Sequence, residues 1–558
     1  MKKVIPFFTA LLCLFIISCQ KNVPLENKES EGIVLGNRKE NPFSIKNYRG
    51  ADKESVAPNF YYYKLRTNNL EKLKELIEEG QELSDIPLDY EIVQGGSFYE
   101  ENVPEDNFTK WYYLMTTVEQ YRNLDSSFQT VILDEMYVPQ SIIDDFENDT
   151  ESVYEDCLNE NSRIAWFDYA KCKPYGTVQV WDEVREEYVP VPNVKVRVSQ
   201  WCFFKETTTD ENGNFRINAN FSTVLQNTLH FKVYFENKND SVFLSGSPIV
   251  SYYIPSDKNI RGFKGCDIKI KKDSDAQFPR ILLAASKYRE YAQKDGIPVR
   301  EELKFWCNNS VSTGVTLMRD VIKVHLDLPS VLLGMICGGP VGAITGDLIA
   351  TALAMYAPDV FVGTAAGEYS TSTENIYELV FHEMSHVSHF TGLGKNQIDY
   401  WGKEYFEQID AWISVRSDGR DPFEDCYNGG KNEVLNHVES WGYFYGFYLN
   451  YRYYSELAEK DSLNEIIYNS IEVLKEYYFN VLDINQFRDD SVNGKFYYEG
   501  YFVLIDDIGF TVKQIFAPYS DSEVVGLDTW KQVFYKQNLI SEENQNVINN
   551  IIKKAQGE

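Results

Sequence analysis

The chain has 558 residues, of which 43% are hydrophobic and 15% aromatic, which excludes long disorder as its main state and predicts about three domains. Its 84 acidic and 54 basic residues give a formal net charge of −30, which repels phosphate backbones and excludes nucleic acid as an expected partner. The acidic residues are spread along the chain, as is typical of a solvated surface.

The amino-terminal residues have the pattern of an export signal. A short basic start precedes an uncharged apolar run over residues 4–17, which is too short to span a bilayer. The run ends in IISC at residues 16–19, which resembles the lipobox of bacterial lipoproteins. The resemblance implies a signal peptide over 1–18, acylation of Cys19 and a lipid anchor and linker over 19–58. The expected location is therefore the bacterial cell envelope, on the outer membrane or cell surface. The alternative is an ordinary secretory peptide with an incidental cysteine.

The cysteines indicate an oxidising compartment but no metal site of their own. Of the nine, seven remain if Cys13 leaves with the signal and Cys19 is lipidated. Cys157 and Cys172 form the closest plausible disulfide pair, although spacing does not determine connectivity. Because no CxxC pair occurs, a cysteine-based zinc site is not expected.

Residues 59–172 are expected to form a mainly helical domain. Apolar residues recur at helical spacing over 69–82, and further helices are predicted over 111–124 and 138–158. Nothing in these segments indicates a chemical role.

The pattern changes to strands over residues 173–272. GTVQV at 176–180 and VKVRV at 194–198 alternate in the manner of strands, and Asn212-Gly213 favours a tight turn between two further strands. Together with the prolines before the second strand, these motifs resemble the carboxypeptidase-regulatory, transthyretin-like β-sandwich family. The resemblance implies an immunoglobulin-like or transthyretin-like accessory domain rather than a catalytic one.

A long uncharged stretch lies between Asp327 and Asp347. On length alone it could span a membrane. Gly338-Gly339-Pro340 in its middle would break a spanning helix, so a buried helical hairpin is the preferred interpretation.

The strongest motif is HExxH at residues 382–386. A capping pattern at 371–374, an apolar stripe and glycines at 392 and 394 predict one helix over about 372–391. His382 and His386 then share one helix face and can bind one Zn²⁺, while Glu383 is placed as the general base for a water molecule.

A catalytic zinc needs a third protein ligand, and the residues after HExxH indicate where to look. Position 389 is His and position 392 is Gly, which departs from the HExxHxxGxxH pattern of metzincins. The departure points to a resemblance to gluzincins, in which a glutamate of a second helix completes the site. Glu439 is the preferred ligand, and the small residues Gly442 and Gly446 beside it would let the second helix approach the first one closely. His437, Glu433 and Asp410 remain alternatives.

Three residues near Glu439 are candidates for stabilising a tetrahedral intermediate: Tyr443, Tyr445 and His437. In the gluzincin resemblance a Tyr or His has this role, and the sequence does not choose among them. His389 lies too far along the helix to share one ion with His382 and is expected to line the site or to pack.

The predicted fold is a multidomain α+β chain with a helical N-terminal region, a β-sandwich middle domain and a zincin-like metallopeptidase domain over 273–558. Residues 360–362 are expected to form the edge strand that receives an extended peptide. The predicted function is zinc-dependent hydrolysis of a peptide or protein substrate, with the specificity of an endopeptidase. The alternative is a surface binding or adhesion lipoprotein that keeps a peptidase-like fold.

Overall fold

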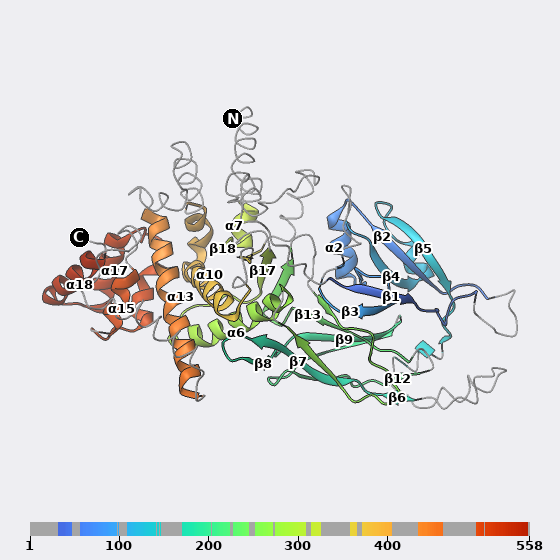
Figure 1. Cartoon of the computed structure of the whole chain (residues 1–558). Helices are drawn as coiled ribbons and strands as arrows, with labels where there is room; N and C mark the ends of the chain where they lie inside the picture. Colours follow the sequence, from blue (N-terminus) through green and yellow to red (C-terminus); the bar gives the residue numbers. More distant parts are fainter. Residues whose placement is uncertain are drawn as a thin grey trace, which may run out of the picture.

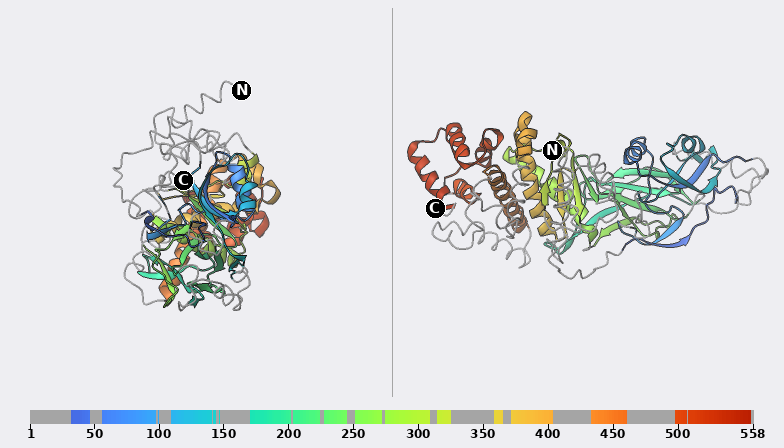
Figure 2. Two further views of the ribbon diagram at one scale, coloured as in Figure 1. Left: turned by 90° about the vertical axis from the view of Figure 1, so that its right-hand side faces the viewer. Right: turned by 90° about the horizontal axis from the view of Figure 1, so that it is seen from above.

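The computed structural model is a mixed α+β protein (Figure 1). Its carboxy-terminal helices lie at one end and its amino-terminal strands at the other, and the view from above shows the same elongated arrangement (Figure 2). The structure describes residues 32–46, 56–97, 99, 109–140, 142–143, 146, 170–201, 203–223, 227–244, 251–271, 274–308, 314–324, 358–364, 371–403, 433–460, 498–506 and 508–555.

The amino-terminal region consists mainly of strands in its described part. Strand β2 (Phe60–Arg66) lies between β4 (Tyr112–Thr117) and β5 (Gln129–Met136), and β1 (Val34–Arg38) pairs with β3 (Tyr90–Gln94). All of these pairs are antiparallel. The prediction of a mainly helical domain was therefore wrong for these residues.

The two predicted helices in this region had different outcomes. The expectation over 69–82 was confirmed as α2 (Leu70–Glu78), whose first turn is capped by the side chain of Asn69. The expectation over 111–124 was wrong, because buried and partly exposed residues alternate along β4, as a half-buried strand requires. Only the short α3 (Val118–Arg122) is helical there. The stretch predicted to be helical over 138–158 lies mostly outside the described residues.

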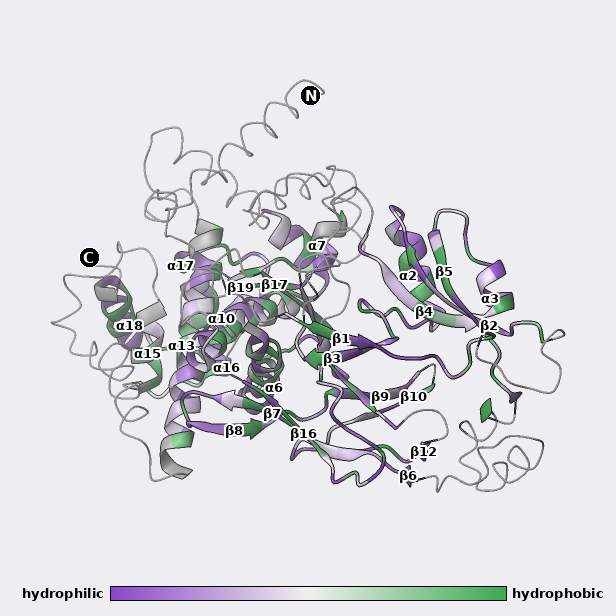
Figure 3. Ribbon diagram, turned by 45° about the vertical axis from the view of Figure 1, so that its right-hand side comes forward, coloured by the Kyte–Doolittle hydropathy of each residue, from purple (hydrophilic) through white to green (hydrophobic). Residues whose placement is uncertain are grey.

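The middle region contains the predicted strands in two sheets and a short ribbon. One sheet has the order β10 (Phe203–Thr208), β9 (Lys195–Gln200), β13 (His230–Tyr234), β15 (Ser251–Tyr253). The other has β11 (Asn214–Arg216), β7 (Tyr175–Asp182) and β16 (Cys266–Ile270), with β8 (Glu187–Pro190) paired to β7. Strands β6 (Lys171–Cys172) and β12 (Phe221–Ser222) form the ribbon. Buried valines alternate with partly exposed polar residues along β9. Figure 3 shows hydrophilic and hydrophobic residues along the strands of this region.

One strand of this middle region belongs to a different sheet. Strand β14 (Asp240–Leu244) pairs in parallel with β17 (Leu303–Asn308), in a sheet of order β14, β17, β19 (Val360–Gly363), β18 (Gly314–Thr316). The predicted boundary at residue 272 thus does not separate two independent sheets. Residues 360–362 are also not an edge strand, because β19 lies between β17 and β18. The edge beside the predicted site is β18.

The remaining described chain is helical. It comprises α6 (Gln277–Asp295), α7 (Arg319–Val324), α10 (Thr373–Gly392), α13 (Glu433–Lys460), α15 (Tyr498–Asp506), α16 (Val512–Phe516), α17 (Leu527–Asn538) and α18 (Glu542–Ala555), with single turns η3 (Ser274–Ala276), η4 (Gly394–Asn396) and η6 (Ala517–Ser520). Helix α10 packs on α13, on α6 and on β18. One hydrophobic core runs from the strands of the middle region into these helices.

Several predictions fall on residues that the structure does not describe. Cys19, the signal peptide and Cys157 lie outside the described ranges, as does the uncharged stretch between Asp327 and Asp347. Within those ranges no helix combines the length and apolar character needed to cross a membrane. Cys172, Cys266 and Cys307 are described as free thiols.

Candidate metal centre

The HExxH motif lies on α10, which matches the predicted helix. Its amino-terminal cap is Ser372, whose hydroxyl accepts a hydrogen bond from the backbone N–H of Asn375 at 3.3 Å. The cap is one residue later than the predicted capping pattern starting at Thr371. Gly392 is the last helical residue. His382 and His386 therefore project from successive turns of one helix.

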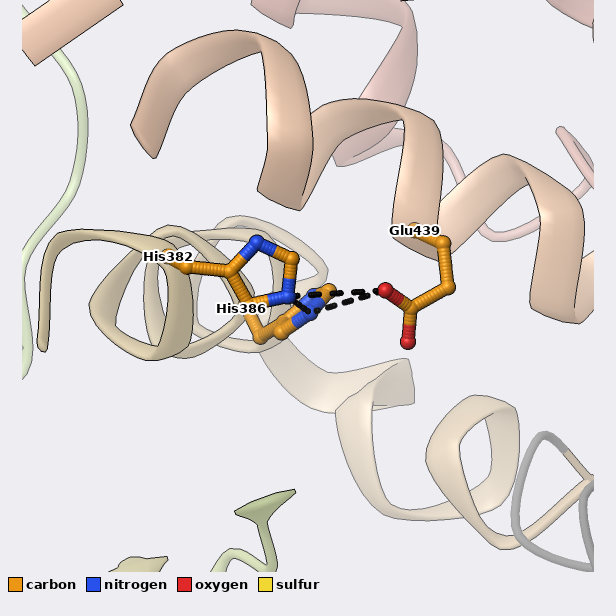
Figure 4. A group of neighbouring side chains, drawn as sticks. All are labelled: His382, His386 and Glu439. Carbon is orange, nitrogen blue, oxygen red and sulfur yellow. Dashed lines mark hydrogen bonds and ion pairs between the residues drawn. The ribbon is translucent and has the colours of Figure 1, made fainter. Parts of the chain in front are cut away.

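Three side chains from two helices converge beside this motif (Figure 4). The Nε2 atoms of His382 and His386 are 3.1 Å apart. One carboxylate oxygen of Glu439, on α13, lies 3.5 Å from the first Nε2 and 3.6 Å from the second. Tetrahedral zinc with bonds of about 2.0–2.2 Å separates neighbouring donors by roughly 3.3–3.6 Å. The three residues can therefore hold a metal ion, and their donor atoms and spacing fit zinc.

Among the described residues, one of the predicted third ligands lies beside the two histidines. Glu439, the preferred one, joins the two histidines. His437 does not, because its ring stacks on Tyr519 with centroids 4.1 Å apart. Asp410 and the side chain of Glu433 lie outside the described part of the chain.

Two glycines allow α13 to approach α10 closely enough for Glu439 to reach the histidines. A Cβ atom added to Gly442 would overlap the His386 ring. A Cβ added to Gly446 would lie 2.9 Å from the Cα of His382, which is closer than real contacts allow. The sequence expectation that small residues permit this crossing is confirmed.

Charge in the centre is unevenly distributed. Burial opposes ionisation of Glu439, but the nearby His386 and His382 outweigh it and lower the pKa of the carboxyl group. Burial likewise opposes protonation of His382, yet Glu439 and Glu383 raise its pKa. Nδ1 of His386 is buried and has no hydrogen-bond partner among the described residues. A cation beside Glu439 would thus meet a carboxylate that is already ionised.

Glu383 is buried but is held apart from this group of three. Its carboxylate accepts a hydrogen bond from the hydroxyl of Thr316, on β18, at 2.8 Å. Gly314, on the same strand, leaves the space that the carboxylate occupies, since an added Cβ would overlap it. Burial raises the pKa of Glu383, and the nearby histidines and Thr316 oppose that rise. Sequence reasoning missed Thr316, because only tertiary pairing brings β18 to α10.

The three candidates for stabilising an intermediate lie in different surroundings. The ring of Tyr443 is 4.6 Å from that of His382. The hydroxyl of Tyr445 donates a hydrogen bond to Asp295 of α6, at 3.0 Å. His437 is fully buried, and burial lowers its pKa to about 3. Tyr443 is therefore the one whose ring the fold brings to a histidine of the candidate metal centre.

His389 packs into a buried aromatic cluster below the centre. Its ring lies 5.3 Å from that of Tyr519 and 6.0 Å from that of His437. Burial lowers its pKa well below the ordinary value. Of the two expectations for His389, packing is the one that these contacts support.

Comparison with known proteins adds nothing to this geometry: no family model, curated protein or solved structure matches the chain.

Proposed function

We propose that this protein is a zinc-dependent peptidase in which His382, His386 and Glu439 hold the metal and Glu383 is the general base. The observation that carries the proposal is the arrangement of four neighbouring side chains. Three of them converge on one point, while the fourth is held nearby by Thr316. A purely structural cluster has no need of a separate buried carboxylate beside the group.

The chemistry assigned to each residue follows from its surroundings. Zn²⁺ bound there would polarise a peptide carbonyl and lower the pKa of a water molecule. Glu383 would accept the proton of the attacking water and deliver it to the leaving amine, and burial, which raises its pKa, suits both transfers. The hydroxyl of Thr316 orients its carboxylate. Tyr443, beside His382, would donate a hydrogen bond to the oxyanion of the tetrahedral intermediate.

The proposal is tested by substituting the general base without touching the metal ligands. In Glu383→Gln the zinc content should stay near one per chain, while peptide cleavage should fall by a factor on the order of 10² or more. Metal analysis and digestion of a peptide library measure the two quantities. Unchanged cleavage in this variant would sink the assignment, and zinc without any cleavage by the parent chain would favour a binding protein.

The predicted envelope location remains a separate proposal. Cys19→Ala should release the protein from the membrane fraction if lipidation anchors it. Retention of the variant in that fraction would contradict the anchor.

A further inference from the structure

The turn that joins β7 and β8, in the middle region, contacts the start of the helix that carries the HExxH motif. The carboxylate of Glu183 in this turn accepts two hydrogen bonds from Thr373, the first residue of α10: one from its backbone N–H, at 3.2 Å, and one from its hydroxyl, at 2.9 Å. The first N–H groups of a helix have no partner within it and favour a negative charge nearby. Glu183 therefore stabilises the start of α10 from outside the helix.

A buried arginine ties this contact to a third element. Arg280, near the start of α6, is 1% exposed and donates hydrogen bonds to Glu183, at 2.8 Å, and to the backbone oxygen of Trp181 on β7, at 2.6 Å. Its guanidinium also donates to the backbone oxygen of Thr371, just before α10. Because a buried charge that loses its partners is costly, these contacts hold the turn, α6 and the start of α10 together.

The same turn also reaches the second helix of the centre. Burial raises the pKa of Tyr453, on α13, and Arg185 opposes that rise through its charge and a hydrogen bond. The ring of Tyr453 stacks on that of Tyr377, on α10, with centroids 4.7 Å apart. The turn itself is fixed by Asp182, whose carboxylate accepts hydrogen bonds from the backbone N–H groups of Val184, at 2.9 Å, and Arg185, at 3.1 Å. One turn of the middle region therefore contacts both helices that supply the candidate ligands.

The placement of α10 along α13 matters because the ligand atoms come from both helices. His382 and His386 are on α10 and Glu439 is on α13, and their donor atoms are 3.1 to 3.6 Å apart. Gly442 and Gly446 allow the close approach, but they contribute no side chain that would keep the helices from sliding along each other. The β7–β8 turn opposes this sliding, since it holds the start of α10 and a residue in the second half of α13.

We propose that Glu183 and Arg185 are positioning residues, which hold α10 and α13 at the relative placement that lets the three candidate ligands bind one ion. Neither would touch the ion, because Thr373 precedes His382 by nine residues, or roughly 13 Å along the helix. The middle region then belongs to the metal centre and is more than the accessory domain that its sequence resemblance implies. The inference rests on the zinc site of the proposed function and is independent of which bond is cleaved.

The test measures metal affinity in protein that is fully folded without metal. Apo protein is titrated with Zn²⁺ against a chelating dye, and with Co²⁺, whose visible absorption bands depend on the geometry of its ligands. Glu183→Gln keeps the size of the side chain but removes its charge. We expect the Kd for Zn²⁺ to rise about tenfold, at the lower end of what contacts behind metal ligands contribute, and the Co²⁺ bands to shift. Circular dichroism and thermal unfolding of the apo form establish that each variant is folded.

Two further variants keep the buried ion pair intact and carry the test if Glu183→Gln does not fold. Thr373→Val removes one of the two hydrogen bonds to the carboxylate, and Tyr453→Phe removes the hydroxyl group that Arg185 contacts. Each should raise the Kd several-fold, whereas Thr373→Ser, which keeps the hydroxyl, should match the parent. The matched control is Glu187→Gln, which makes the same change at an exposed position of β8 and should leave the Kd unchanged.

The outcomes separate this positioning role from a purely structural one and from the proposed function. The parent's Kd and Co²⁺ bands in folded Glu183→Gln, or in both further variants where that one does not fold, overturn the proposal even if the melting temperature falls, because a contact that only stabilises the fold gives that result. A Kd that rises equally in Glu187→Gln also overturns it. In a parent chain that binds zinc but cleaves no peptide, the predicted rise in Kd supports the positioning role while the peptidase is removed. A parent that binds neither ion removes both.

Discussion

Two polar clusters in this protein are built in opposite ways. Around Asp85, where the amino-terminal region contacts strands β13 and β15 of the middle region, the carboxylate meets partners of opposite charge. The carboxylate accepts hydrogen bonds from Tyr253, at 2.7 Å, and from Lys110, at 3.2 Å. The ammonium group of Lys232 lies 4.6 Å from the centre of the Tyr253 ring. The Asp85 carboxylate therefore has its hydrogen-bond partners within the chain.

The crossing of α10 and α13 is the contrasting case. Three atoms that could bind a metal ion converge there, and Nδ1 of His386 has no hydrogen-bond partner among the described residues. Burial of polar groups is costly unless they are paired. The pairing of the Asp85 carboxylate is therefore typical of a structural contact, whereas the unpaired Nδ1 of His386 and the converging donor atoms at the crossing are typical of a site that binds a ligand.

The largest expected effect is a loss of zinc affinity when Glu439, the proposed third ligand, is substituted. Glu439→Gln should lower zinc affinity by more than the roughly 10- to 100-fold that outer-shell losses cost, and activity should fall with it. The matched control is His437→Asn, two residues earlier on α13, which should retain the metal. Equilibrium dialysis measures both. If Glu439→Gln binds zinc like the parent, the third ligand lies elsewhere, and Asp410→Asn is the next variant.

Substituting Asp85 should lower the stability of the protein without changing its zinc binding. Burial favours the neutral form of Asp85, but Lys110, Lys232 and Tyr253 outweigh it and lower its pKa to about 2. Asp85→Asn should therefore cost about 2 kcal/mol of unfolding free energy at neutral pH and leave zinc content unchanged. Denaturant titration measures it.

The same pKa shift predicts the pH dependence of that loss. The folded state binds the proton less readily than the unfolded state, so the stabilisation is present above pH 4 and is lost as the pH falls from about 4 towards 2. The difference between parent and Asp85→Asn should shrink over this window. A difference that is constant from pH 7 to 2.5 would contradict the ion pairing.

A smaller effect tests whether close helix approach serves the metal rather than the fold. In Gly442→Ala the new methyl group overlaps the His386 ring, and we expect zinc affinity to fall about tenfold as the ring or helix shifts. Alanine is favoured over glycine within a helix by about 1 kcal/mol, so the apo protein need not lose stability. Calorimetric zinc titration and thermal unfolding of the apo form separate these effects. Full zinc affinity in Gly442→Ala would show that the crossing tolerates the methyl group.

The smallest effect concerns the orientation of the general base. The Thr316 hydroxyl lowers the pKa of Glu383, so Thr316→Val should raise that pKa. On the acidic side, kcat/KM falls as Glu383 becomes protonated, and the pH of this fall should move upward in the variant. Activity at the optimum should decrease several-fold. Thr316→Ser keeps the hydroxyl and should restore the pH of this fall. An unchanged pH of the fall in the valine variant would remove Thr316 from the site.

Local sequence determined the helix that carries the motif. Capping residues, the apolar stripe and the i, i+4 spacing of His382 and His386 act within a few turns, so they could be recognised without knowledge of the rest of the chain. The strands β7 and β9 of the middle region were predictable for the same reason, since their alternation and the turn at Gly213 are local. The strand β4 could not be predicted in this way, because the aromatic and β-branched residues at 112–117 are compatible with both helical and strand spacing. Only pairing with a neighbouring strand decides between the two.

Tertiary structure decided what lies next to that helix. Glu439 could be preferred from sequence, but its selection over His437 depends on which face of α13 the two glycines press against α10. The inner position of β19, the edge position of β18 and the entry of β14 into their sheet depend on pairing between distant segments. Such pairings depend on burial and backbone hydrogen bonds across the whole fold, which no local pattern encodes.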